Sequence, residues 1–246
     1  ASGADNRIIS LSHANNTFTG ATTIASGTTL KGKVDNIVAG SSQVIMQSSA
    51  VFDLNNTNQL VSRLSGSGEV LISSGKTLTA SNILSGTNDS TYEGILKGLG
   101  QLNKTGAGKL TLTGENIYTG LTTVTGGTLQ VGNGSVTGSI YGGVLLDGSS
   151  TTLAFNRINQ LAYAGNVTGT GSLTKDGAGT LIMTGTSSYT GQTTVRGGQL
   201  QVGNGGTQGS IHAMVNAGGT VSVESGASLA FKLSDNRELT GTVSGA

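Results

Sequence analysis

The chain has 246 residues, a formal net charge of +1 and only 10% charged residues, so its charge favours neither nucleic acid nor an anionic membrane as a partner. Cysteine and proline are absent, which excludes a disulfide-stapled scaffold, and no apolar run approaches the roughly 20 residues of a transmembrane helix. The chain begins Ala1-Ser2-Gly3 without a Met or a signal peptide, and we therefore expect it to be part of a longer protein.

The predicted elements are short strands separated by glycine and asparagine. Gly accounts for 42 residues and apolar residues for 35%, and the two kinds are interspersed rather than segregated. Residues 110–114 and 129–132 show the pattern clearly, because Leu and Val alternate there with Thr and Gln before a Gly. Alternation with a period of two, ended by Gly or Asn, is typical of strands and turns. Spacing typical of amphipathic helices is absent, so we expect an all-β chain.

An internal repeat organises these strands along the chain. The first, diverged copy begins near the N-terminus, where residues 18–24 parallel residues 118–124. A full copy at residues 102–140 then matches residues 173–211 at a constant offset of 71, without a gap. Towards the C-terminus the offset between matching residues grows to 76, which indicates about five inserted residues in a turn or loop.

Stacked coils give each of these short strands a neighbour above and below, whereas isolated hairpins would bury little. We therefore predict a single parallel β-helix over residues 1–246, with repeats near residues 16–27, 100–140 and 171–211. At roughly 20–25 residues per turn the chain would form about ten to twelve turns and a rod about 50 Å long. The 71-residue repeat would then be three turns. The alternatives, a jelly roll or an antiparallel sandwich, do not predict a gapless match of this length.

Residues 100–124 closely resemble the passenger-associated transport repeat of autotransporters, from Gly-Gln-Leu-Asn-Lys-Thr-Gly-Ala-Gly-Lys-Leu to Tyr-Thr-Gly-Leu-Thr-Thr-Val. Residues 171–195 are similar to it as well, and residues 16–27 resemble only the half that lacks Lys-x-Gly-x-Gly. The resemblance implies a right-handed β-helix on the bacterial cell surface or secreted from it. It also implies that the repeats help the passenger to fold and exit. The C-terminal outer-membrane β-barrel of the parent protein, which is not in this sequence, would be the translocating partner.

Candidate catalytic, cofactor-binding and metal-binding residues are sparse. His13 and His212 would lie roughly 40 Å apart in a solenoid, so they cannot share a metal ion or act as an acid–base pair. No Gly-x-Ser-x-Gly nucleophile motif occurs, and Lys109 is not followed by the Ser or Thr of a phosphate-binding loop. The Gly-Asn-Gly runs at residues 132–134 and 203–205 are interpreted as corner turns. The sequence therefore predicts no catalytic residue, cofactor or metal.

Three glutamates form the one carboxylate set that could carry chemistry. Glu69, Glu93 and Glu115 are separated by 24 and 22 residues, close to one turn each, so they could stack on one face. Neighbouring carboxylates would suit a glycan-active enzyme. Lysines in the same turns instead favour a solvated charged face with ordinary exposed ion pairs, which is the interpretation preferred here. These lysines are Lys97, Lys104 and Lys109.

The aromatic residues recur at fixed repeat positions. Phe18, Tyr118 and Tyr189 share one position, and Phe155 and Phe231 share another. Residues three or more turns apart cannot form one exposed carbohydrate-binding ladder, so we expect these side chains to pack in the core or at corners.

These patterns favour a surface scaffold over an enzyme. We expect the rod to mediate adhesion, aggregation or biofilm formation, through self-association with other copies or by binding a host-surface protein or glycan. The alternative is a secreted virulence effector or toxin that engages a host receptor from the same solenoid. A glycan-active β-helix enzyme is the third hypothesis. The terminal turns, with uncovered strand edges, are expected to unfold first.

Overall fold

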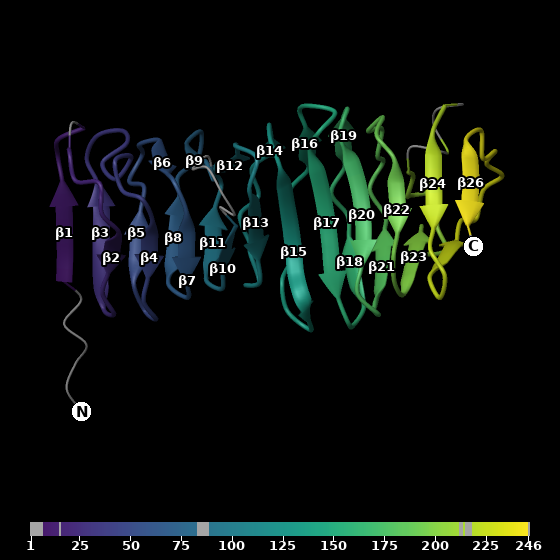
Figure 1. Ribbon diagram of the computed structural model, residues 1–246, viewed down its shortest axis with the longest axis horizontal. Coiled ribbons are helices and arrows are strands. Elements are labelled where there is room, and N and C mark those ends of the chain that lie inside the picture. Colours follow the sequence, from purple (N-terminus) through teal and green to yellow (C-terminus); the bar gives the residue numbers. More distant parts are fainter. Residues whose placement is uncertain (1–6, 15, 83–88, 212–213, 215–217, 246) are drawn as a thin grey trace.

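The computed structural model describes residues 7–14, 16–82, 89–211, 214 and 218–245, whose strands stack along one long axis (Figure 1). Strands β1 (Arg7–Leu11) and β26 (Thr242–Gly245) lie at opposite ends of this axis. All strand pairs among the described residues are parallel. The predicted all-β parallel solenoid is therefore confirmed.

One sheet runs the full length of the molecule, and we call it the B face. It contributes one strand to each turn, so its 11 strands correspond to 11 turns, within the predicted range. At about 4.8 Å per turn, the rod is about 50 Å long. The strands of the B face are β2 (Thr22–Ile24), β4 (Val44–Met46), β7 (Leu64–Gly66), β10 (Ser90–Tyr92), β13 (Lys109–Leu112), β15 (Thr128–Ser135), β17 (Thr152–Arg157), β20 (Ser172–Asp176), β22 (Thr193–Val195), β24 (Thr220–Val223) and β26.

Three shorter sheets complete the other two faces. The C face is one sheet of β6 (Gln59–Val61), β9 (Thr77–Ala80), β12 (Gln101–Lys104), β14 (Thr122–Val124), β16 (Val144–Leu146) and β19 (Val167–Gly169). The A face begins with β1, β3 (Thr28–Gly32), β5 (Val51–Asp53), β8 (Glu69–Ile72) and β11 (Ile95–Gly98). It resumes as a separate sheet of β18 (Leu161–Tyr163), β21 (Thr180–Met183), β23 (Gln199–Val202) and β25 (Ser228–Phe231).

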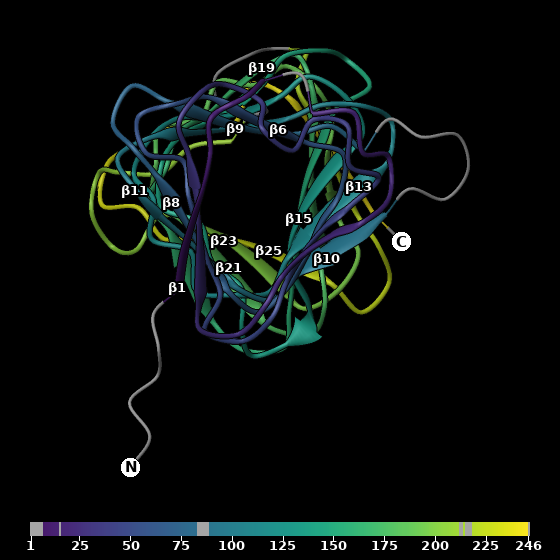
Figure 2. The ribbon, with the colours of Figure 1, turned by 90° about the vertical axis from the view of Figure 1, so that its left-hand side faces the viewer.

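The order of the faces gives the solenoid its hand. Viewed from the N-terminal end, the chain passes from β8 on the left to β9 at the top and β10 on the right, and then returns to β11 (Figure 2). This path is clockwise while the chain recedes from the viewer. The β-helix is therefore right-handed, as the resemblance implied.

The core is built from side chains that occupy the same inward-facing position in successive strands. Leu110, Leu129, Leu153 and Leu173 are register partners on the B face, and each is fully buried. The alternation in the sequence places one residue of every two inside, and parallel stacking sets the same kind of side chain above it. A single hydrophobic core therefore extends from Ile24 to Val221.

The 71-residue repeat is not three turns, as predicted, but three turns and one further face. Three turns along the C face take the chain from Leu102 to Val167. Leu173, which matches Leu102 in the repeat, lies on the next face in β20. These three turns together contain fewer residues than the 71 of the repeat. The second copy is consequently rotated by one face about the axis.

The expected packing is confirmed for three of the five aromatic side chains. Tyr118, Tyr189 and Phe155 are at most 1% exposed, whereas Phe18 is 40% and Phe231 is 46% exposed, so the prediction was wrong for these two. Phe231 lies in β25, the last strand of its sheet, where no described strand covers it. Phe18 lies in the N-terminal turns, before the core is continuous.

Candidate functional site

The candidate site is an open groove where the regular A face is interrupted. Between β11 and β18, the A face contains one isolated parallel bridge, Glu115 to Ser139, among the residues that the structure describes. A hollow of about 480 Å³ lies on the β11 side of this bridge, and a second of about 250 Å³ lies on the β18 side. Both are lined by Glu115. We call the two hollows together the A-face groove.

The groove contains two of the three predicted glutamates and excludes the third. Glu93 and Glu115 line the first hollow together. Glu69 instead forms an ion pair with Lys97 from the strand above it. The first hollow is completed by Ile95, Thr113, Gly114, Asn133, Ser135 and Thr137. The second is lined, besides Glu115, by Ser139, Ile140, Tyr141, Arg157, Leu161, Ala162 and Ala164.

A buried asparagine side chain replaces the missing strand pairing under the groove. The Asn116 amide Nδ2 donates to the carbonyls of Gly114 at 2.9 Å and Ser139 at 3.0 Å. Its Oδ1 accepts from the backbone N–H of Leu96 at 2.9 Å. Because one side chain serves polar groups of three successive turns, the backbone can leave the strand conformation here without losing its hydrogen bonds.

Arg157 fixes the position of Glu115, the residue that the two hollows share. Its guanidinium is largely buried and donates to the carbonyls of Val136 and Gly138, and to Oδ1 of Asn159 at 2.9 Å. Its Nη1 lies 3.5 Å from Oε1 of Glu115, which also accepts from the N–H of Gly138 at 3.2 Å. These contacts compensate the buried charge and hold the Glu115 carboxylate in one place. Glu93 takes part in none of the ion pairs found in the described ranges.

The prediction of an exposed ion pair was wrong for Lys104. This side chain is fully buried, and its Nζ donates to the carbonyls of Thr105 at 2.7 Å, Gly106 at 2.9 Å and Gly126 at 3.0 Å. Burial lowers the pKa of Lys104 to about 8. The lysine of the repeat therefore caps a corner of the coil from inside, because three carbonyls turn inward there. Lys109 does pair at the surface, with Asp89 at 3.8 Å.

Three buried tyrosines have phenol hydroxyls with a raised pKa, and each hydroxyl is hydrogen-bonded inside the protein. The hydroxyls of Tyr92 and Tyr163 donate to the carbonyls of Gly68 and Gly142, both at 2.7 Å. The hydroxyl of Tyr118 lies 2.5 Å from Oγ1 of Thr122. Burial raises the pKa of all three phenols well above the ordinary value. These phenols pack in the core, away from the groove surface.

The other residues singled out from the sequence are the two histidines and the Gly-Asn-Gly runs. His13 is exposed and lies 3.5 Å from the hydroxyl of Ser12, and His212 lies outside the described residues. No group of three or more His, Asp or Glu within the described ranges is placed to hold a metal ion. Gly203 and Gly205 adopt positive φ angles in the turn after β23, as predicted, whereas Gly132 and Gly134 adopt them inside β15, where the strand register shifts, so the predicted corner was wrong for residues 132–134. None of the residues that the structure describes forms a helix long and apolar enough to cross a membrane.

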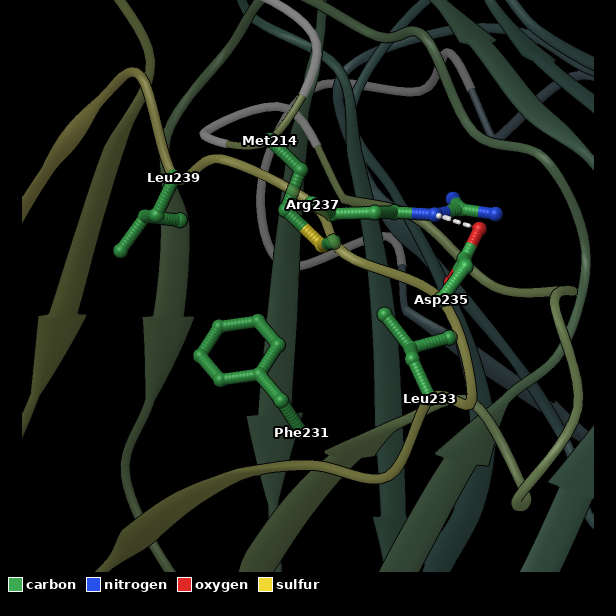
Figure 3. Close-up of a pocket in the computed structure, with 6 residues that line it drawn as sticks. All are labelled: Met214, Phe231, Leu233, Asp235, Arg237 and Leu239. Atoms are coloured by element: carbon green, nitrogen blue, oxygen red, sulfur yellow. Dashed lines mark hydrogen bonds and ion pairs between the residues drawn. The ribbon is translucent and has the colours of Figure 1, made fainter.

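An apolar pocket of about 260 Å³ lies near the C-terminal end of the rod, beside the end of β25 (Figure 3). Arg237 and Asp235 pair at 3.0 Å on its rim, and Arg237 also donates to the carbonyls of Thr207 and Gly209. These acceptors match the two carbonyls that Arg157 binds one repeat earlier. The pocket adjoins the uncovered edge of β25 and is otherwise lined by Met214, Phe231, Leu233 and Leu239.

Sequence reasoning found Glu93 and Glu115 but missed Tyr141 and Arg157 as groove residues. Their side chains converge only because of the interruption of the A face. One signal was available, since Glu115 stands where the second copy has Thr186. A charged residue at one copy of an otherwise repeated position indicates a local specialisation.

Comparisons with known proteins find the same repeat. The Passenger-associated-transport-repeat family matches residues 10–30, 102–131 and 173–202, which confirms the resemblance. Over 176 residues, or 63% of the chain, the sequence is 39% identical to a protein named Adhesin BmaC autotransporter, from Brucella suis biovar 1 (strain 1330). The chain spans 5% of the length of that relative. No solved structure gives a significant match.

Proposed function

Because the chain is a segment of an autotransporter passenger that carries passenger-associated transport repeats, we propose that it forms a rigid surface rod for adhesion, aggregation or biofilm formation. The observation that carries this proposal is the B face, which continues without a break through all 11 turns. Parallel strands stacked over one closed core resist bending, so the solenoid can hold a binding surface away from the cell. The relative named as an adhesin supports the same role.

The surface chemistry of the rod supports contacts with other copies or with a host surface. Its charges are largely balanced locally, as in the pairs Lys31–Asp53 at 3.4 Å and Lys109–Asp89 at 3.8 Å. A net charge of +1 imposes little long-range repulsion between two copies. Many weak contacts along such a rod add by multivalency. The other partner that we propose is the outer-membrane barrel of the parent protein, which would anchor the passenger.

Surface display tests the adhesive role. Bacteria that display the parent passenger should clump and attach to host cells or to a solid surface. Bacteria whose passenger lacks residues 1–246 should lose much of this activity at an equal surface level. Unchanged clumping and attachment after this deletion would contradict the proposal.

The register of the coil offers a matched control for this deletion. Val44 and Leu64 are partners in neighbouring turns, so deletion of residues 44–63 removes one turn and keeps the stacking. If the segment is a rod, this shortened passenger should be exported and should adhere as the parent does.

We also propose that the segment acts without catalysis. An adhesin relative supports a binding role rather than a chemical one. Incubation of the purified chain with oligosaccharides should release no reducing ends. Release by the parent chain that is abolished in Glu93→Gln would instead support the glycan-active hypothesis.

A further inference from the structure

The two full repeats differ in chemistry at the A-face groove. Across the 71-residue offset, the groove residues Glu115, Ser135 and Thr137 correspond to Thr186, Gly206 and Gln208. The residues that build the corners, such as Lys104 and Lys175, are the same in both copies. The first repeat therefore has the shared scaffold and, in addition, a carboxylate at a groove position where the second repeat has the neutral Thr186.

One buried hydroxyl in the groove lacks a hydrogen-bond partner among the described residues. Ser139 lines the second hollow and is 7% exposed, and its Oγ has no hydrogen-bond partner among the described residues. In the second copy, the matching Ser210 hydroxyl accepts from the N–H of Ser187 at 2.7 Å and donates to its carbonyl at 3.0 Å. Asn116 replaces Ser187 in the first copy and binds the Ser139 carbonyl instead. An unpaired buried hydroxyl is costly and points to a partner that is not part of the chain.

The walls of the groove combine hydrogen-bonding groups with an exposed aromatic ring. Glu93 offers a carboxylate that forms no ion pair with the residues the structure describes, and Asn133 offers both an acceptor and donors. Tyr141 on the second hollow is 63% exposed, although the three residues before it are buried. A tyrosine ring presents an apolar face and a polar edge together, which suits a ligand with both kinds of surface.

We propose that the A-face groove binds an uncharged, hydroxyl-rich oligosaccharide of the target surface. Sugar hydroxyls would donate to Glu93 and Glu115, and the C–H face of one ring would lie on Tyr141. The groove spans four successive turns, about 15 Å at 4.8 Å per turn, so it accepts a short chain of sugars rather than one ring. This inference rests on the proposed adhesive function and names the chemistry of its target.

The charges of the groove favour a neutral glycan over the other ligands. Two carboxylates face one guanidinium, and Arg157 is already engaged by Glu115 and by backbone carbonyls. An acidic sugar would meet the unpaired charge of Glu93, which repels it. A basic peptide would gain little, because Arg157 already compensates Glu115 and a single exposed pair with Glu93 contributes little.

Binding of the purified chain to immobilised oligosaccharides tests the proposal. Neutral oligosaccharides should be retained, and sialylated or sulfated forms of the same backbones should be retained less. Tyr141→Ala and Glu93→Gln should each weaken binding by about tenfold or more, since each removes a direct contact. Absence of binding to every neutral oligosaccharide, or preferential binding of a basic peptide, would overturn the proposal.

The repeat supplies a matched control for the same measurement. Asn133 lines the groove, whereas Asn204 occupies the same repeat position in the second copy, outside the groove. Asn133→Ala should weaken glycan binding, and Asn204→Ala should leave it unchanged. Equal losses in both variants would overturn the assignment to the groove.

The glycan proposal and the adhesive function fail in different ways. Displayed passengers that attach and clump, together with a purified chain that binds no glycan, would refute the groove but not the scaffold. A chain that binds glycan while the cells never adhere would refute the scaffold and leave the groove site in place.

Discussion

The two full repeats, residues 102–131 and 173–202, share their corner lysine and tyrosine contacts although they lie on different faces of the solenoid. Lys104 and Lys175 each donate to three corner carbonyls at distances that differ by at most 0.1 Å between the copies. Tyr118 pairs with Thr122, and Tyr189 with Thr193, at 2.5 Å in both. Local structure in this chain therefore follows local sequence, whereas the number of residues between the copies sets the direction in which each copy faces.

The partial copy near the N-terminus shows which contacts the repeat can lose. Phe18 stands where the full copies have tyrosine, and it has no hydroxyl to bind the threonine four residues later. Thr22 pairs instead with the hydroxyl of Ser41 in the next turn, at 2.6 Å. The corner lysine is absent from this copy, and Phe18 is exposed. Without these internal anchors the first turn depends on its neighbour.

The largest effect that we expect comes from removing a corner lysine. Lys104→Ala and Lys175→Ala should each lower the free energy of unfolding by about 3–5 kcal/mol, because three inward carbonyls and a cavity are left. Denaturant unfolding of the purified variants measures this loss. The two losses should agree within about 1 kcal/mol, since the contacts are the same.

An exposed lysine of the same motif provides the control. Lys109→Ala should change the free energy of unfolding by less than about 1 kcal/mol, because its ion pair with Asp89 lies at the surface. A loss for Lys104→Ala as small as that for Lys109→Ala would show that the corner does not depend on the lysine.

The stacked glycines of the two copies should give the next largest effect. A Cβ on Gly120 or Gly191 would lie within 3.0 Å of the carbonyl of Gly100 or Gly171 in the turn below. Gly120→Ala and Gly191→Ala should each cost about 1–3 kcal/mol, because neighbouring backbones must move apart. Thermal unfolding monitored by circular dichroism measures the cost.

Gly20 occupies the same position in the partial copy, where a Cβ would meet no atom within 4 Å. Gly20→Ala should therefore leave stability nearly unchanged. A loss equal to that of Gly120→Ala would mean that stacking across turns is not the cause.

Buried lysines and buried tyrosines should change the stability in opposite directions as the pH rises. Burial lowers the pKa of Lys104 from 10.5 to about 8, so between these values the unfolded chain binds more protons and stability rises with pH. Burial raises the pKa of Tyr92 and Tyr118 above 10.0, so above pH 10 the unfolded chain loses protons first and stability falls. We expect the rise to be about 1 kcal/mol, because three carbonyl acceptors stabilise the charged ammonium and offset part of its desolvation.

Denaturant titrations from pH 7 to 11 measure this profile. The double variant Lys104→Met, Lys175→Met should lose the rise above pH 8 and keep the fall above pH 10. Retention of the rise in this variant would assign it to other groups.

The smallest effect should come from the surface charges, which differ between the copies. Lys97 pairs with Glu69, whereas the matching position in the second copy is Thr168. Lys97→Ala should cost between about 0 and 1 kcal/mol, and less at high salt, because the pair is exposed and screened. Unfolding at low and high ionic strength checks both statements, and a cost above that range would give surface pairs a structural role.

The sequence by itself determined the strands, the glycine corners and the repeat of this solenoid. Alternation and positive φ angles depend on residues a few positions apart, as in Leu110–Thr113 and Gly203–Gly205, so they can be read without the fold. The number of turns also followed from the chain length, because the residues required per turn vary little.

Only the tertiary structure decided that Lys104 is buried, that the second copy is rotated by one face, and that Glu93 and Glu115 share a groove without Glu69. Each of these three features depends on which side chains stack on one another in neighbouring turns. The number of residues in every turn sets that stacking, so small differences in turn length accumulate along the axis. Sequence spacing alone could place the three glutamates about one turn apart, but the interruption of the A face between β11 and β18 determined which of them meet.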